Sequence, residues 1–202
     1  MIDVLVAVDL QNDFIDGALG TKEALAIVEN AKKKIKAFPG PVFFTRDTHA
    51  PSYLETEEGK HLPVPHCIKG TKGWEIREEL DELRKTEAID KPTFGSVELG
   101  EKLKRLDEEE GVRSVTLLGL CTDICVISNA FVIKAYLPNA HIMVDSEASA
   151  GVTPESHRRA LEAREMCQIE IPDAPILSWP NPRLHGRLPQ LLSCLLLLSI
   201  VS

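Results

Sequence analysis

The chain has 202 residues, of which 44% are apolar, and this suits a single domain with a sizeable buried core. Its 23 basic and 31 acidic residues give a net charge of -8, which argues against a nucleic-acid partner because a phosphate-binding face needs a basic excess. The five cysteines are an odd number, and no basic leader precedes the first apolar run. We therefore expect free thiols in a reducing, cytoplasmic compartment.

Short apolar runs alternate with helical patterns along the first 171 residues. Strands are expected at residues 2–10, 42–45, 87–90, 114–120, 141–145 and 168–171. Helices are expected at residues 21–37, 75–84, 97–110, 123–136 and 154–166. This alternation predicts an α/β class, a three-layer Rossmann-like fold with a six-stranded parallel sheet flanked by helices. A GxGxxG pattern is absent, so nothing supports a dinucleotide site.

Two segments depart from this alternation. Residues 46–73 show no clean period, and a loop of that length in a compact domain is usually functional. Residues 172–202 are rich in proline and end in an apolar run over residues 191–201, which is shorter than the roughly 20 residues that span a bilayer. We expect a domain over residues 1–171, an atypical Pro-rich and apolar tail over 172–202, and no membrane partner.

Polar side chains follow four consecutive predicted strands at the point where each strand ends. Asp9 follows the first strand, Asp47 and His49 the second, Lys91 the third, and the segment leading to Cys125 the fourth. Ligands of open parallel sheets bind beyond the carboxyl ends of the strands. The sequence therefore predicts a functional site at this edge of the sheet.

Cys125 lies in the first turn of a predicted helix, where the helix dipole favours a thiolate, and a nearby lysine would lower the pKa of the thiol further. A carboxylate such as Asp9 can accept the thiol proton and return it to a leaving group. Taken singly, Cys125 is more often a small buried residue, Asp9 a loop cap and Lys91 a surface charge. Their combination favours a cysteine nucleophile. Cys121 and Cys125 form CxxxC, a weaker indication of a redox pair or a shared metal, because thiol exchange uses CxxC.

The segment that begins at Asp47 and His49 also carries a candidate metal site. Two imidazoles with carboxylates suit zinc, iron or manganese, and the spacing Asp-x-His puts both side chains on one side of an extended segment. Further candidate ligands are Glu55, Glu57, Glu58, His61 and His66. The alternative is a polar loop whose histidines cap turns, and the length of the loop favours the metal. Cys67 is compatible with either a metal ligand or the core.

At five places the sequence resembles the isochorismatase-like cysteine hydrolases, and among them the pyrazinamidase/nicotinamidase branch. These places are VAVDLQNDF at Asp9, RDTH at Asp47, LPVPHCIKGT at His66, KPTFGS at Lys91 and GLCTDICV at Cys125. The resemblance runs from residue 1 to about residue 171, and the tail has no counterpart in the family pattern.

The resemblance implies a catalytic triad of Asp9, Lys91 and Cys125. It also implies a cis peptide bond between Leu120 and Cys121, with an oxyanion hole built from the backbone N–H groups of Cys121 and Cys125. Metal ligation by Asp47, His49 and His66 follows in the same way. Some nicotinamidases add a glutamate from the loop before the last histidine, and we expect Glu58 in this role, with Glu55 and Glu57 as alternatives.

The function that the resemblance implies is hydrolysis of nicotinamide to nicotinate and ammonia through a Cys125 thioester, as part of NAD salvage. One divalent metal ion, zinc before iron or manganese, would anchor the pyridine nitrogen. Phe14 and Leu19 would line the ring pocket, with core or loop packing as the alternative. Two other functions remain open: a metal-free relative that acts on another small amide, a ureido acid or the vinyl ether of isochorismate, and a non-catalytic binding protein on the same fold. The apolar tail is compatible with a homo-oligomer.

Overall fold

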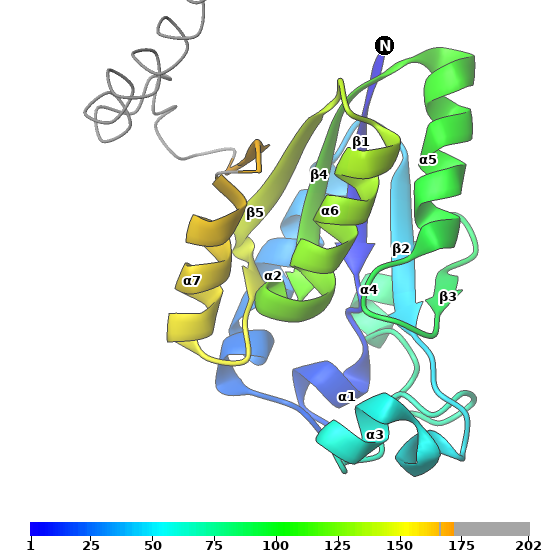
Figure 1. Ribbon diagram of the computed structural model, residues 1–202, viewed down its shortest axis with the longest axis vertical. Helices are drawn as coiled ribbons and strands as arrows, with labels where there is room; N and C mark the ends of the chain where they lie inside the picture. Colours follow the sequence, from blue (N-terminus) through cyan, green and yellow to red (C-terminus); the bar gives the residue numbers. More distant parts are fainter. Residues whose placement is uncertain (166, 172–202) are drawn as a thin grey trace, which may run out of the picture. The chain divides into compact units, whose positions relative to one another are not determined.

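A parallel sheet of six strands forms the centre of the computed structural model, which describes residues 1–165 and 167–171 (Figure 1). The strands are β1 (Ile2–Val8), β2 (Val42–Asp47), β3 (Ile89–Lys91), β4 (Val112–Leu120), β5 (His141–Ala150) and β6 (Ile169–Glu170). Their order in the sheet is β3-β2-β1-β4-β5-β6, and every neighbouring pair is parallel. The predicted α/β fold is confirmed. The tail expected at residues 172–202 lies outside the described residues.

Helices connect the strands, and several begin at polar residues that cap them. They are α1 (Asn12–Ile15), α2 (Lys22–Ala37), α3 (Glu57–His61), α4 (Glu78–Asp81), α5 (Val97–Glu110), α6 (Ile127–Tyr136) and α7 (Pro154–Glu165), with a 3-10 turn η1 (Tyr53–Glu55) and a π-turn η2 (Thr122–Val126). The Thr21 hydroxyl accepts a hydrogen bond from the N–H of Ala24 at the start of α2, and Ser96 accepts one from Leu99 at the start of α5. Both caps satisfy backbone donors that the first turn leaves free.

Strand β1 is buried on both faces, and this divides the core into two parts. Val4, Val6 and Val8 pack in one cluster with apolar residues of α5 and α6, whereas Leu5 and Ala7 pack in a second cluster with those of α2. Successive side chains of a strand point to opposite faces, so an unbroken apolar run requires cover on both sides. Figure 1 shows α5 and α6 in front of the sheet and α2 behind it, while α1 and α3 lie beyond the carboxyl ends of the strands.

Tertiary pairing shortens one predicted helix. The helix expected at residues 75–84 is reduced to α4, because Ile76 forms an antiparallel bridge with Gln11 and the carbonyl of Glu75 accepts the N–H of Asn12. The chain at 75–76 is therefore held extended against the segment after β1. The strand expected at residues 87–90 lies slightly later, at β3, where Lys91 is paired with Asp47 of β2.

Two other predictions differ in detail. The segment 46–73, expected as a loop, contains η1 and α3, and the Thr56 hydroxyl caps α3 by accepting the N–H of Gly59. The helix expected at residues 123–136 begins as the π-turn η2 before it continues as α6. The helix expected at 154–166 is α7, and residue 166 lies outside the described residues.

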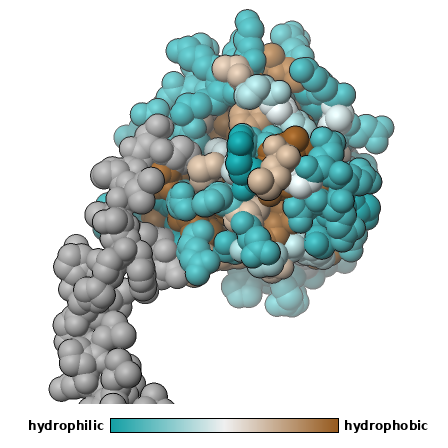
Figure 2. All heavy atoms as spheres, turned by 90° about the horizontal axis from the view of Figure 1, so that it is seen from above, coloured by the Kyte–Doolittle hydropathy of each residue, from teal (hydrophilic) through white to brown (hydrophobic). Residues whose placement is uncertain are grey.

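The end of the molecule at which β1 begins carries mainly hydrophilic side chains, with smaller apolar areas between them (Figure 2). Among the helices of the described residues, none combines the length and the apolar character that crossing a bilayer requires. The cavity described below lies at the other end of the sheet, where the strands terminate.

Candidate active site

The carboxyl ends of four adjacent strands bring together the four side chains that the sequence singled out. Because β3, β2, β1 and β4 are neighbours in the sheet, Lys91, Asp47, Asp9 and the turn that carries Cys125 converge at one edge. All four side chains are withdrawn from solvent, with residue exposures of 1%, 2%, 0% and 4% for Lys91, Asp47, Asp9 and Cys125. The burial of Lys91 excludes its interpretation as a solvated surface charge.

The Lys91 ammonium is the hub of this arrangement. Its Nζ lies 2.6 Å from Asp9 Oδ2, 3.4 Å from Asp47 Oδ1 and 3.5 Å from Cys125 Sγ, and it donates a hydrogen bond to the carbonyl of Thr93 at 3.2 Å. Burial lowers the pKa of Lys91, but the charges of Asp9, Cys125 and Asp47 outweigh it and hold the pKa above its ordinary value. The ammonium therefore stays charged and links the thiol to two carboxylates.

The sequence predicts a lowered pKa for the Cys125 thiol, and this prediction differs from what the structure indicates. Burial, followed by the charge of Asp9, raises the pKa of Cys125 well above its ordinary value, and the charge of Lys91 offsets only part of this. Burial also raises the pKa of Asp9, whose Oδ1 accepts the hydroxyl of Thr45 at 2.6 Å. Desolvation disfavours an isolated thiolate here, so a reaction at Cys125 needs a base that takes its proton.

The backbone around these side chains has unusual conformations. Asp9 adopts a positive φ of 48°, a left-handed conformation that aspartate tolerates better than most residues. The peptide bond between Leu120 and Cys121 is cis, as the resemblance implied. The use of the Cys121 and Cys125 N–H groups as an oxyanion hole stays a prediction.

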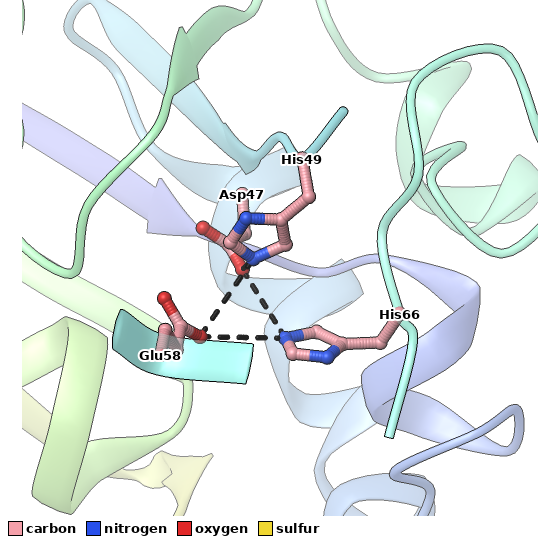
Figure 3. Close-up of side chains that lie close together, drawn as sticks. All are labelled: Asp47, His49, Glu58 and His66. Carbon is pink, nitrogen blue, oxygen red and sulfur yellow. Dashed lines mark hydrogen bonds and ion pairs between the residues drawn. The ribbon is translucent and has the colours of Figure 1, made fainter. Parts of the chain in front are cut away.

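Four potential metal ligands meet beside Lys91. Asp47, His49, Glu58 and His66 each offer one ligand atom, and these atoms lie within 4.8 Å of one another. Figure 3 shows the polar ends of all four side chains turned toward one point. Glu58 comes from α3, and the structure does not place Glu55, Glu57 or His61 in this cluster.

The cluster fits a divalent metal on several grounds. His66 Nε2 lies 3.6 Å from Asp47 Oδ2 and 3.7 Å from Glu58 Oε1, and its Nδ1 is hydrogen-bonded to the carbonyl of Val64 at 2.8 Å. A backbone carbonyl on the second ring nitrogen is the usual way to orient a metal-binding imidazole. Burial and the charge of Asp47 raise the pKa of Glu58, a repulsion that a cation would relieve. Two imidazoles with two carboxylates suit zinc, iron or manganese.

Neighbouring residues hold these ligands in place. The ring of Tyr53 packs against both imidazoles, with centroids 4.7 Å from His49 and 4.9 Å from His66. The amide of Gln11 donates to the carbonyl of Asp47 at 2.8 Å and accepts its N–H at 2.7 Å. Cys67 is fully buried in the second core cluster and is not among the ligands, which favours its interpretation as core.

A cavity of about 610 Å³ extends from the Cys125 thiol to the four potential metal ligands. Phe14 and Leu19, the predicted pocket residues, line it together with Cys125, Glu58 and His66. Sequence reasoning missed further apolar lining residues, namely Leu62, Phe94, Ile124 and Val152. Phe94 and Ile124 lie within the motifs KPTFGS and GLCTDICV, which could have indicated them, whereas nothing local marks Val152. A mostly apolar cavity with a few polar groups is typical of a small-molecule site.

Comparison with known proteins assigns the chain to a family. The model of the isochorismatase domain matches residues 3–173, so the chain belongs to the isochorismatase family, and it is a hydrolase of that family. A Bacillus subtilis protein described as an uncharacterized isochorismatase family protein, PncA, is 30% identical over 173 residues, covering 80% of this chain and 93% of that protein. The nicotinamidase of Schizosaccharomyces pombe is 25% identical over 203 residues, covering 83% and 91%.

Solved structures agree with this assignment. The crystal structure of a Pyrococcus horikoshii pyrazinamidase in complex with zinc is similar with a TM-score of 0.69 and 27% identity, and the match covers 84% of this chain and 97% of that one. The predicted membership of the isochorismatase-like hydrolases is confirmed.

Proposed function

We propose that this protein is a nicotinamidase-type amidohydrolase, which hydrolyses nicotinamide to nicotinate and ammonia. One observation carries the proposal: Lys91 joins a buried Cys125 and Asp9 to Asp47, which belongs to the cluster of Asp47, His49, Glu58 and His66, and the thiol and the cluster face a single cavity. The nicotinamidase and the pyrazinamidase among the relatives support a small amide as the substrate, with cleavage of its carbon–nitrogen bond.

In the proposed reaction, Asp9 acts first as a base. It takes the proton of the Cys125 thiol, and the ammonium of Lys91, 3.5 Å from Sγ, stabilises the thiolate. The thiolate sulfur attacks the amide carbonyl carbon, and the carbon–nitrogen bond breaks as Asp9 returns the proton to departing ammonia, which leaves a thioester. Asp9 then takes a proton from water, whose oxygen attacks the thioester carbon. The carbon–sulfur bond breaks, the acid is released, and Asp9 returns the proton to the sulfur of Cys125. The raised pKa of Asp9 suits both roles, because it brings the carboxyl closer to neutral pH.

Two further elements complete the proposal. The backbone N–H groups of Cys121 and Cys125 receive the charge on the carbonyl oxygen, as preorganised donors do in acyl-transfer enzymes. The four clustered side chains would hold one divalent metal ion, zinc in preference to iron or manganese, and such an ion would supply an anchor for a ring nitrogen of the substrate. Phe14 and Leu19 contact the ring. The physiological role that follows is NAD salvage in the cytoplasm.

Ammonia release from nicotinamide by the purified protein tests the proposal, with metal content measured on the same sample and Cys125→Ala as the control. We expect release that needs Cys125 and about one metal ion per chain, as a single site of this kind requires. A folded, metal-loaded protein that releases no ammonia would exclude nicotinamide and direct the search to ureido acids and isochorismate. Release that survives Cys125→Ala would overturn the cysteine mechanism.

A further inference from the structure

The loop between β3 and α5, residues 92–95, carries two parts of the site although it lies at the surface. The carbonyl of Thr93 accepts a hydrogen bond from Lys91 Nζ at 3.2 Å, and Phe94 lines the cavity while 43% of it is exposed. The Thr93 hydroxyl donates to the carbonyl of Gly95 within the loop itself. One of the four contacts of the Lys91 ammonium is therefore supplied by a short exposed segment, which must be held from elsewhere.

The side chain that holds this loop is Asn129 of α6, which is fully buried. Its Oδ1 accepts the N–H of Ser96 at 2.9 Å, and its Nδ2 donates to the carbonyl of Phe94 at 3.0 Å. The same Nδ2 donates its second hydrogen bond to the carbonyl of Cys125 at 2.8 Å. One amide group thus joins the backbone of the cysteine to the loop that anchors the lysine.

The loop also packs closely on α6. A side-chain carbon added at Gly95 would come within 3.0 Å of Val132 and 3.4 Å of the carbonyl of Ser128. The two segments are more than 30 residues apart in the sequence, so only contacts of this kind keep them in register. A buried amide whose two donors are both used is a rigid link, because each lost bond would leave a backbone carbonyl without its partner, and the carbonyl of Cys125 is buried.

We propose that Asn129 is a positioning residue, which sets the separation of Lys91 Nζ and Cys125 Sγ by tying the loop at residues 92–95 and the adjoining Ser96 to the turn that carries Cys125. The inference rests on the proposed function in one respect, the role of Cys125 as nucleophile. Asn129 touches neither the substrate nor the reacting atoms. A misplacement of about 1 Å at a catalytic group can lower the rate by as much as a hundredfold, so the hydrogen bonds of Asn129 should affect the catalytic rate.

Asn129→Ser separates the hydrogen bonds of Asn129 to the loop from its hydrogen bond to the carbonyl of Cys125. A serine hydroxyl still reaches the carbonyl four residues earlier, that of Cys125, but is too short to reach Phe94 and Ser96. The matched control is Asn30→Ser, which removes one hydrogen bond to the carbonyl of Glu147 outside the site. Gly95→Ala loosens the loop from its own side and serves where Asn129→Ser does not fold.

Two measurements on each folded variant test whether Asn129 positions Lys91. The first gives kcat and KM for nicotinamide. The second gives the pH midpoint of Cys125 alkylation by iodoacetamide, measured by peptide mass spectrometry with the exposed Cys167 as internal reference. We expect Asn129→Ser and Gly95→Ala to lower kcat by roughly ten- to a hundredfold with a smaller change in KM. We also expect the alkylation midpoint to move to higher pH as Lys91 moves away. Asn30→Ser leaves both unchanged.

A purely structural role gives a different result. In that case Asn129→Ser lowers the unfolding temperature, but the kcat of the folded protein and the alkylation midpoint stay at their wild-type values, and this outcome overturns the proposal. If the wild-type protein does not hydrolyse nicotinamide, the proposed function fails by itself. The alkylation midpoint needs no substrate and still decides whether Asn129 positions Lys91 against Cys125.

Discussion

Replacement of Lys91 by methionine removes the one positive charge that lies between two buried carboxylates of the described site. Lys91 Nζ is 2.6 Å from Asp9 and 3.4 Å from Asp47, and methionine keeps the length of the side chain without the ammonium. Removal of one partner from a buried ion pair leaves an uncompensated buried charge, at a cost of roughly 3–5 kcal/mol. The total stability of a domain is only about 5–15 kcal/mol, so we expect a large loss.

Urea unfolding followed by circular dichroism measures this loss. With a slope of roughly 2 kcal/mol per molar urea, a cost of about 4 kcal/mol moves the midpoint down by about 2 M. A chelator in every sample keeps metal binding out of the comparison. Burial already raises the pKa of Asp9, and the loss of Lys91 raises it further. A carboxyl whose pKa is raised in the folded state destabilises the fold once the pH exceeds its ordinary pKa, so the loss should shrink as the pH is lowered toward that value.

The double variant Asp9→Asn with Lys91→Met is the control for this reasoning. It removes both charges, and the Thr45 hydroxyl can still donate to the asparagine oxygen that replaces Asp9 Oδ1. We expect the double variant to lose less stability than the sum of the single variants, with a coupling of about 1–3 kcal/mol. A midpoint for Lys91→Met close to that of the wild type, or strict additivity of the two changes, would refute the buried ion pair as the cause.

Three further predictions concern the metal cluster, a strand and the surface. Glu58→Gln should weaken zinc binding by more than about tenfold, since even changes behind the ligands have that effect, and competition with a chromophoric chelator measures it; an unchanged affinity would remove Glu58 from the ligand set. Gly119 has a φ of +122°, and a side-chain carbon added there would come within 2.1 Å of the carbonyl oxygen of Val8. Gly119→Ala should therefore introduce a strain of about 3 kcal/mol and lower the unfolding temperature by about 6–12 °C. An unaltered melting curve would contradict this. The hydrogen bond from Arg113 lowers the pKa of Asp3 to about 2, so its contribution to stability is present above the ordinary carboxyl pKa and is lost as the pH falls toward 2. Arg113→Ala should return the Asp3 pKa to the usual carboxyl range in an NMR titration, and a value that stays near 2 would assign the shift to another group.

The sheet and the meeting of Asp9, Lys91 and Cys125 could be predicted from the sequence, because both depend on local patterns. An unbroken apolar run at β1 requires cover on both faces, and the carboxyl ends of parallel strands share one edge. The same rules located Asp47 and His49. They could not separate Glu58 from its neighbours Glu55 and Glu57, because that choice depends on the path of a segment with no periodic pattern.

The shortened helix α4 shows that a tertiary contact can override a local helical pattern. Its predicted first residues have a helical period, but Ile76 pairs with Gln11, a partner more than 60 residues away that periodicity does not reveal. Asn129 was missed for a similar reason. In the sequence it is one of several polar residues in a largely apolar helix, beside Ser128, and only the fold places its amide between Cys125 and Phe94.

The direction in which the pKa of Cys125 shifts depends on tertiary structure. The position of Cys125 at the start of a helix, beside a lysine, predicts a lowered thiol pKa from sequence. The structure buries the thiol with Asp9, so its pKa is raised instead. Sequence determined which chemical groups stand at the ends of the strands, because those positions follow from the alternation of strand and helix. Only the packed fold determined how much water those groups lose and which charges face them, because both depend on residues that are distant in the chain.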